Sequence, residues 1–352
     1  MKAILTHGAA VSVLLYLYLF AEAPASVAPR QARASASVAS SGRATLAPVG
    51  TCDPSADYGD ANGIALDARG DIYTAMGDRL PGSGEAVGVE IRKWSATGRL
   101  LATWMTPGMR RDAAHHPADV AVDVHGDIYV SDTNAGHIIK LSATGRVLAI
   151  WGAPGTAAGQ FGRPAGIAVD RRGAVYVADK GNGRVQVLDA MGRPRAVWRL
   201  PSPRPGQASL PSGLAVDERG RVYVADDAIR ILVLSPDGAT LRAWGSKGSQ
   251  PDQFRHPVGI ALDPQGHLDI ADKLNARIQQ FSVTGTPLRR WTTGASATGW
   301  FNAQGLAPAQ PAFPTGVAVT TRGTIYTLAG WCTSRIQAFV PDGRTMAIWS
   351  VK

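Results

Sequence analysis

Residues 161–187 read FGRPAGIAVDRRGAVYVADKGNGRVQV, and their pattern indicates how the chain folds. Three short runs within it, IAV, VYV and VQV, are rich in β-branched and apolar residues, which favour strands. Asp170–Gly173 separates the first two runs, and in such an Asp-x-x-Gly turn the Asp oxygen caps the turn and Gly takes a positive φ. A further alternating run ends at Trp198. The stretch and its continuation therefore predict four short antiparallel strands.

The same unit occurs six times along the chain. Its first strand begins at Gly63, Asp119, Gly166, Gly213, Gly259 and Gly316, and its last strand ends near Trp104, Trp151, Trp198, Trp244, Trp291 and Trp349. Successive Trp residues are 47, 47, 46, 47 and 58 positions apart. Four-stranded units that repeat at about 40–50 residues form propeller blades, because no unit buries both of its faces alone. We expect an all-β fold, a six-bladed β-propeller of four-stranded antiparallel blades over residues 51–352.

Charged and polar residues recur at fixed places in the units. Asp132, Asp179, Asp226 and Asp272 end the second strand, and Arg184, Arg230, Arg277 and Arg335 begin the third. One interpretation of these Asp residues, with the Asn residues that follow them, is a calcium site in each blade. A turn that is repeated needs the same cap each time, which favours instead an Asp that satisfies backbone groups of its own loop. We expect the Arg residues to pair with these loops.

The N-terminal residues are typical of an export signal. An apolar run of 13 residues at 9–21 follows Lys2, and Ala23-Pro24-Ala25 fits a small-x-small cleavage site. The run is too short to span a bilayer of about 30 Å as a helix, so residues 1–25 are predicted to be a cleaved signal peptide, with an uncleaved anchor as the alternative. Residues 26–50 are an Ala/Ser/Pro/Arg stretch that we interpret as a disordered linker. The mature chain is therefore expected to be exported, with no membrane span after cleavage.

The charge pattern and the titratable residues exclude several partners and chemistries. The chain has 36 Lys and Arg against 27 Asp and Glu, a formal net charge of +9, but its basic residues are scattered in runs no longer than two. Nucleic-acid tails cluster such residues, so no nucleic-acid partner is expected. His115 and His116 precede a proline in a connecting loop and are interpreted as a solvated pair. No complete zinc or catalytic motif occurs, so no metal or cofactor is predicted, and we expect a monomer.

The repeated pattern resembles a known repeat family. Residues 161–187 are similar to the NHL repeat, F-x-x-P-x-G-I-A-V-D-x-x-G-x-V-Y-V-A-D-x-x-N-x-R-I-Q-V, including Asp179, Asn182 and Arg184. The resemblance covers about residues 58–352, and repeats one and six match least well. It implies the propeller fold and leaves the function open, since NHL propellers are binding platforms in some proteins and lyases in others.

One segment resembles an enzyme family with the same expected fold. Residues 330–336, GWCTSRI, are similar to the G-Y-C-N-S-R-I loop of peptidylglycine amidating lyases, in which the aromatic residue is a catalytic Tyr. In that family zinc is held by three His residues, each directly after the Pro that begins an innermost strand. Here those positions hold Asn62, Ala118, Ala165, Ser212, Val258 and Thr315. Without the metal ligands, and with Trp331 in place of Tyr, the lyase reaction is not expected. Virginiamycin-type lyases are a second propeller family for comparison, but they have a seventh blade that this sequence lacks.

Two insertions indicate where a partner would bind. Four blade-to-blade links span 13 residues from Trp to Pro, whereas the fifth, Trp291 to Pro314, spans 23. The first repeat has a second insertion between strands two and three, at Met76–Gly88. Both insertions fall on the loop face beside the seam between blades six and one, where function rather than folding can set loop length, although neutral drift is the alternative. The candidate binding residues are Arg79, Glu85, Trp300, Phe301 and Trp331, with a core role also open for Phe301.

The two cysteines of the chain, Cys52 and Cys332, are predicted to form a disulfide. Both are expected in loops of the same face, one leading into blade one and the other in blade six, and an exported protein can oxidise them. Two unpaired thiols are the alternative.

These expectations favour a binding scaffold for a protein, glycan or cell-envelope ligand on the loop face. The alternative is a metal-dependent lyase or lactonase that uses the channel mouth. A third class, RNA binding through a basic face, conflicts with export and with the scattered Arg residues.

Overall fold

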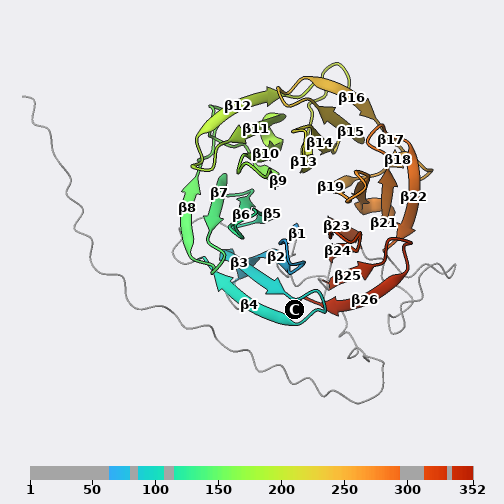
Figure 1. Cartoon of the computed structure of the whole chain (residues 1–352). Coiled ribbons are helices and arrows are strands. Elements are labelled where there is room, and N and C mark those ends of the chain that lie inside the picture. The colour runs from blue at the N-terminus through green and yellow to red at the C-terminus, as the bar shows by residue number, and fades with distance from the viewer. Residues whose placement is uncertain (1–62, 80–85, 107–114, 294–312, 331–334, 352) are drawn as a thin grey trace, which may run out of the picture. The chain divides into compact units, whose positions relative to one another are not determined.

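The computed structural model describes residues 63–79, 86–106, 115–293, 313–330 and 335–351. These residues form six four-stranded antiparallel sheets, and each sheet follows the order of its strands in the sequence. The sheets stand around a common centre as the blades of a propeller (Figure 1). The predicted fold class is confirmed. No helix in these ranges is long and apolar enough to cross a membrane, and the predicted signal peptide and linker lie outside them.

The strand bounds show the repeat directly. Blades one to three comprise β1 (Gly63–Leu66), β2 (Ile72–Arg79), β3 (Ala86–Trp94) and β4 (Leu100–Met105); β5 (Pro117–Val122), β6 (Ile128–Asp132), β7 (His137–Leu141) and β8 (Val147–Trp151); β9 (Pro164–Val169), β10 (Val175–Asp179), β11 (Arg184–Leu188) and β12 (Pro194–Arg199). Blades four to six comprise β13 (Pro211–Val216), β14 (Val222–Asp226), β15 (Arg230–Leu234) and β16 (Thr240–Trp244); β19 (Pro257–Leu262), β20 (Leu268–Asp272), β21 (Arg277–Phe281) and β22 (Pro287–Thr292); β23 (Phe313–Val319), β24 (Ile325–Gly330), β25 (Arg335–Phe339) and β26 (Thr345–Ser350). Short 3₁₀ turns η1 (Lys180–Asn182) and η2 (Lys273–Asn275) join strands two and three of blades three and five, and β17 (Ser246–Lys247) pairs in parallel with β18 (Gln253–Phe254) in one blade link.

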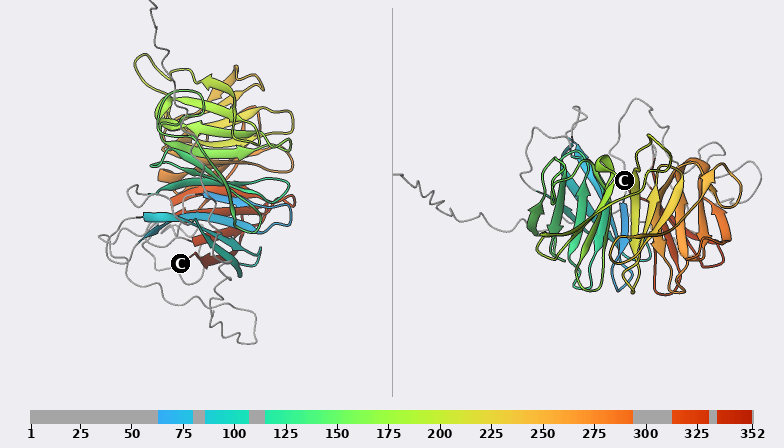
Figure 2. Two further views of the ribbon diagram at one scale, coloured as in Figure 1. Left: turned by 90° about the vertical axis from the view of Figure 1, so that its left-hand side faces the viewer. Right: turned by 90° about the horizontal axis from the view of Figure 1, so that it is seen from above.

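The innermost strands contact one another in order around the centre, and β23 also contacts β1, which closes the ring. The side views in Figure 2 show the blades standing side by side with their loops at the two ends. Blade one consists of β1 to β4 and blade six of β23 to β26, so neither blade borrows a strand from the other chain end. Closure therefore depends on packing between blades rather than on a shared sheet.

The core lies between the blades. In one cluster, Tyr129 and Ile138 of blade two pack with Val175, Val177 and Leu188 of blade three, and all five are almost fully buried. Five similar clusters occur among the described residues, one of which joins blades six and one. Each blade therefore buries its two faces against two neighbours, as a repeat that cannot fold alone must do.

The turns have the predicted chemistry. Asp170 Oδ1 accepts hydrogen bonds from the amides of Arg172 and Ala174, both at 2.9 Å, and Gly173 has φ +80°. Thr320 takes the same role in blade six, where its Oγ1 accepts from the Thr324 amide at 3.0 Å. The Asp-x-x-Gly sequence is thus a fold determinant, and its Asp is not free for another purpose.

The insertion in blade one differs from the predicted loop. β2 continues to Arg79 and β3 begins at Ala86, and the two strands stay paired through Met76–Glu90 and Gly77–Val89. Much of the inserted sequence therefore lengthens a hairpin instead of forming an irregular loop. The reason is that VGVE continues the alternating pattern of β3 outward, so the ladder adds pairs on both strands.

Candidate functional site

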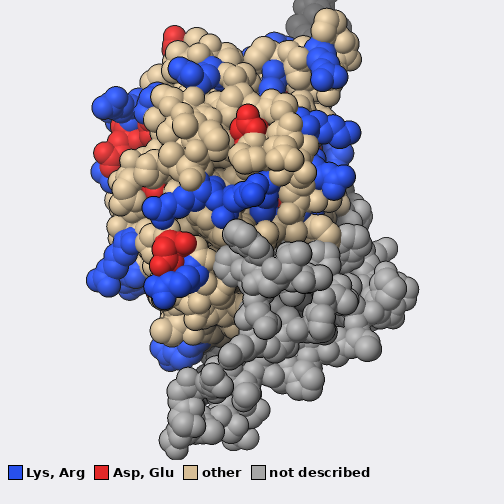
Figure 3. Space-filling view, turned by 90° about the vertical axis from the view of Figure 1, so that its right-hand side faces the viewer, with Lys and Arg blue, Asp and Glu red and all other residues tan. Residues whose placement is uncertain are grey.

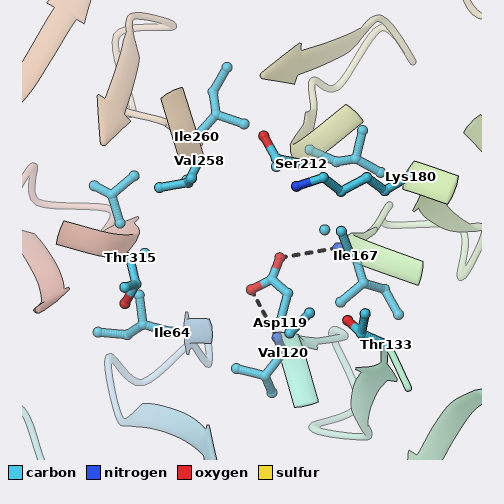
Figure 4. Close-up of a pocket in the computed structure, with 18 of the residues that line it drawn as sticks. Ile64, Asp119, Val120, Thr133, Ile167, Lys180, Ser212, Val258, Ile260 and Thr315 are labelled. Carbon is cyan, nitrogen blue, oxygen red and sulfur yellow. Dashed lines mark hydrogen bonds between the residues drawn. The ribbon is translucent and has the colours of Figure 1, made fainter. Parts of the chain in front are cut away.

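The centre of the ring contains a cavity of about 260 Å³. Its walls come from the beginnings of the innermost strands, and its rim comes from the loops between strands two and three and from the blade links that precede the innermost strands. Figure 4 shows the labelled side chains around this opening, with Asp119 projecting into it. The cavity therefore opens on the loop face on which the sequence placed the partner site.

A ring of small residues lets the innermost strands approach closely. Gly63, Gly166, Gly213, Gly259 and Gly316 occupy equivalent positions in five blades, and Asp119 occupies that position in blade two. A methyl group on Gly213 would lie only 2.1 Å from the carbonyl oxygen of Val258 in the next blade. Side chains are therefore excluded from most of this ring, and Asp119 is the member that puts a carboxyl group into the channel.

Both oxygens of Asp119 are engaged. Oδ1 accepts from the Val120 amide at 2.9 Å, and Oδ2 accepts from the Ile167 amide of blade three at 3.1 Å (Figure 4). Burial raises the pKa of Asp119 to about 7, although these two backbone hydrogen bonds favour the ionised form. The side chain joins blades two and three and titrates near neutral pH.

Basic side chains dominate the described part of the rim. Arg163, Lys180 and Lys273 line the opening, and neither Arg163 nor Lys273 forms an ion pair with a described residue. Lys180 bonds to Asp227, and His256 Nε2 lies 3.2 Å from the other oxygen of that carboxylate. Burial alone would raise the pKa of Asp227, but its bonds to His256 and Lys180 outweigh that effect and hold the pKa below the usual value. Among the described residues, the rim therefore presents two cations without an ion pair, together with Lys180, whose charge is paired with that of Asp227.

The channel positions that carry zinc ligands in the amidating lyases do not fit a metal here. Ala118, Ala165, Ser212, Val258 and Thr315 line the cavity, and Asn62 lies outside the described residues. The Ser212 hydroxyl bonds to the carbonyl oxygens of Ala225 and Pro257, both at 2.9 Å. The Thr315 hydroxyl likewise bonds to the Leu328 carbonyl oxygen at 3.2 Å. Aliphatic side chains and two engaged hydroxyls provide no zinc-binding set. In the part of the chain that the structure describes, no group of three or more His, Cys, Asp or Glu side chains is placed to hold a metal ion.

The Asp at the end of strand two holds its own loop together. Asp179 Oδ1 accepts from the Gly162 amide at 2.7 Å, while Oδ2 accepts from Asn182 at 2.9 Å and from Arg184 Nε at 2.6 Å. Arg184 also donates to three carbonyls of the preceding blade link. The interpretation of these residues as loop caps is confirmed for this blade, because the carboxylate oxygens already have protein donors.

In blade two the Asp at the end of strand two bonds to a histidine of the preceding blade link, His115, and not to an Arg of strand three. His115 is buried, with 4% of its surface exposed, and its Nδ1 lies 2.5 Å from Asp132 Oδ2. Burial would raise the pKa of Asp132, but the bonds from His115 and the His116 amide hold it below the usual value. The prediction of a solvated pair is correct for His116, which is exposed, and wrong for His115. The carboxylate needs a donor here because His137 stands at the Arg position.

The sequence-predicted partner site falls mostly outside the described residues. Glu85, Trp300, Phe301 and Trp331 lie there, as do Cys52 and Cys332. Arg79 ends β2, on the extended hairpin of blade one, and its side chain is not described. These assignments stay predictions.

The residues that define the channel mouth were not among the predicted site residues. Asp119 was visible as the one non-glycine at its position among the six repeats, and Lys180 and Lys273 as the residues that follow the strand-two Asp. Comparison of equivalent positions, rather than of loop lengths, is the signal that could have found them.

A six-bladed β-propeller with a cation-rimmed central cavity is the class that this geometry defines. The family model of the NHL repeat matches residues 161–188, which lie mainly in blade three. Together with the six equivalent blades, this match shows an NHL-type propeller. A search among curated proteins finds no match.

Solved structures support the same fold. A structure of streptogramin B lyase has a TM-score of 0.57 at 17% identity over 85% of both chains, and virginiamycin B lyase from Staphylococcus aureus has 0.57 at 14% identity over 86% of this chain and 87% of that one. The structure of U3-55K has a TM-score of 0.55 at 16% identity over 82% and 81%. Identities this low show the fold and no shared activity.

Proposed function

We propose that this chain is an exported binding scaffold that takes a carboxylate-bearing ligand of protein, glycan or cell-envelope origin at its loop face. The observation that carries the proposal is that two cations on the rim of the central cavity, Arg163 and Lys273, form no ion pair with a described residue. Cations that lack protein partners at a concave mouth attract anionic groups and give a site its charge selectivity.

The groups inside the cavity favour binding over chemistry. Both oxygens of Asp119 are held by backbone amides, and Ser212 is held by two carbonyls. A general base or nucleophile needs an oxygen that is directed at the substrate. These side chains instead fix the positions of neighbouring blades.

The alternative function is a metal-dependent propeller enzyme, a lyase or lactonase, at the same mouth. Its support is a carboxyl group in the channel whose pKa is raised to about 7 by burial, a value suited to proton transfer near neutral pH. A stoichiometric amount of tightly bound zinc in the purified protein would favour this alternative over the scaffold.

The test is isothermal titration with three carboxylate-bearing probes: oligogalacturonate, a glutamate oligopeptide and soluble peptidoglycan fragments. The double variant R163A/K273A removes these two rim cations and should bind the preferred probe about tenfold more weakly at low salt. Arg172 and Arg219 are exposed in turns at the opposite end of the blades, so R172A/R219A is a control of equal charge.

The preferred probe identifies the origin of the ligand. Equal losses in the two double variants would mean that net charge, not the mouth, governs binding, and absence of binding by all three probes would reject a carboxylate ligand. Basic side chains are also spread over the outer side of the ring (Figure 3), which is why the charge-matched control is needed.

A further inference from the structure

Three blades share an ion pair between strand two and strand three. Arg Nε lies 2.6 Å from the Asp carboxylate for Arg184–Asp179, 3.0 Å for Arg230–Asp226 and 3.0 Å for Arg277–Asp272. In each pair the Asp is fully buried and directly opposite the Arg in the strand register. The blade is therefore constructed to bury a guanidinium against a carboxylate.

Blade six keeps the Arg and lacks the Asp. Ala329 pairs with Arg335 in the register, at the position where blade three has Asp179 and Arg184. Only 8% of Arg335 is exposed, and its Nε donates to no described residue, contrary to the expected loop pairing. Burial lowers the pKa of Arg335, because no carboxylate among the described residues compensates its charge. A buried guanidinium without a counter-charge is costly unless an anion joins it.

Two further polar groups on the same face of blade six lack described partners. Thr327 and Gln337 are opposite each other, two pairs along the ladder from Ala329 and Arg335, and 0% and 4% of them are exposed. Thr327 Oγ1 and Gln337 Oε1 make no hydrogen bond with the described part of the chain. In blade three the equivalent Gln186 donates from Nε2 to Asp179 Oδ2 at 3.1 Å, and Val177 stands where blade six has Thr. Compared with blade three, blade six therefore lacks the carboxylate acceptor of Asp179 and has an additional donor in the Thr327 hydroxyl.

We propose that the position vacated at Ala329 binds the carboxylate group of a ligand, held by Arg335, Gln337 and Thr327. The Ala329 side chain ends at the methyl group, whereas Asp continues into a carboxylate at this position in four other blades. A guanidinium fork matches a carboxylate in shape as well as in charge. The Thr327 hydroxyl and the Gln337 Nε2 amide group are neutral donors beside it, whereas Gln337 Oε1 is an acceptor and would not bind the carboxylate.

The two sequence segments of blade six that correspond to the blade link and the loop around Arg184 in blade three contain no acidic side chain. Residues 294–312 and 331–334 have no Asp or Glu. In blade three Arg184 also bonds three backbone carbonyls, but these add no negative charge. The carboxylate is therefore the group that blade six lacks and that a ligand would supply. This site is separate from the rim cations of the proposed function, because it uses none of them.

Thermal unfolding of the full chain with sodium acetate or formate tests the proposal, with sodium chloride at the same pH and ionic strength as reference. The wild type should gain about 2–4 °C in Tm at a tenfold excess over the dissociation constant, and chloride should not reproduce the gain. R335A should lose the acetate response. A329D supplies the carboxylate from the chain, so it should raise Tm without acetate and abolish the response.

Blade three offers the matched control. D179A creates the arrangement of blade six beside Arg184 and Gln186, so its lower Tm should recover in part with acetate or formate. If D179A does not fold, the Tm values of the wild type and A329D with and without acetate still test the proposal. An equal gain with chloride would indicate an adventitious ion only, and an A329D protein that is less stable, or that still responds to acetate, would overturn the proposal.

Discussion

Trp349, in the last strand of blade six, lies against Gly98 in a turn of blade one. A Cβ atom at Gly98 would lie 2.7 Å from the indole ring. The same contact joins consecutive blades elsewhere, as in Trp104–Gly145, Trp151–Gly192, Trp198–Gly238 and Trp244–Gly285. At the seam it is accompanied by a hydrogen bond from the Tyr326 hydroxyl to the Ala96 carbonyl at 3.3 Å. The ring therefore closes with the contact that it uses between its other blades, and Figure 1 shows β26 beside β4 at this point.

The Trp349 contact predicts a graded effect of two glycine substitutions. Gly98 and Gly70 both have φ +83°, but no atom lies within 4 Å of a Cβ at Gly70. G70A should therefore cost only the strain of the backbone conformation, whereas G98A should also displace the indole and cost about 1–3 kcal/mol more. Urea unfolding of the two variants measures the difference. Equal losses would show that the seam adjusts freely around a methyl group.

A buried carboxyl group in blade five predicts a pH dependence of stability. Asp269 stands where four other blades have a Tyr whose hydroxyl bonds to the turn Asp, for example Tyr176 to Asp170. Gln280 Nε2 donates to both Asp269 and Asp263 at 3.2 Å, and Asp269 Oδ2 has no described partner. Burial, with the nearby Asp263 charge, raises the pKa of Asp269 to about 8.

The sign of the effect follows from the proton that the folded state retains. The unfolded chain releases it near pH 3.9 and the folded protein near pH 8, so the contribution of Asp269 to stability falls as pH rises from about 4 to 8. D269N removes this ionisation and should exceed the wild type by about 1–3 kcal/mol at pH 8.5, with little advantage near pH 4. Denaturant titrations of both proteins across this range provide the measurement. A difference that does not depend on pH would contradict it.

The repeated features of this chain were predictable, and the departures from the repeat were not interpreted correctly. Strand positions and turns recur six times, so a strand pattern that arose by chance in one unit would not be repeated in the other five. Arg335 lacks a described partner because Ala329, and not Asp, faces it across the strand ladder. A comparison of loop lengths does not show which residues face each other. Asp119 acquires its role only because six innermost strands converge on one axis. A sequence window contains one of these strands at a time, so it gives no information on what meets at the centre.

The longer link between blades five and six gives a prediction about partner binding. Deletion of residues 303–312 shortens the span from Trp291 to Pro314 to the 13 residues of four other links. The variant should therefore fold with nearly unchanged Tm, and it should bind its partner more weakly if Trp300 and Phe301 border the site. Binding of the preferred carboxylate probe, measured with and without the deletion, is the readout. Unchanged affinity in a folded variant would remove this link from the site.

The predicted disulfide would cross the seam between blades one and six, and it has the largest expected effect on the free energy of unfolding. Cys52 and Cys332 lie outside the described residues, 280 positions apart in the sequence. Blades one and six share no sheet, so a covalent bond between the segment that precedes β1 and the segment between β24 and β25 would oppose opening at the point where the chain ends meet. Closure of a loop of about 280 residues predicts a stabilisation of about 4–5 kcal/mol before strain. C332S and reduction of the wild type should therefore lower Tm to the same extent, and reduction should not affect C332S further. Non-reducing mass spectrometry of the exported protein provides the direct check, since two free thiols there would reject the bond.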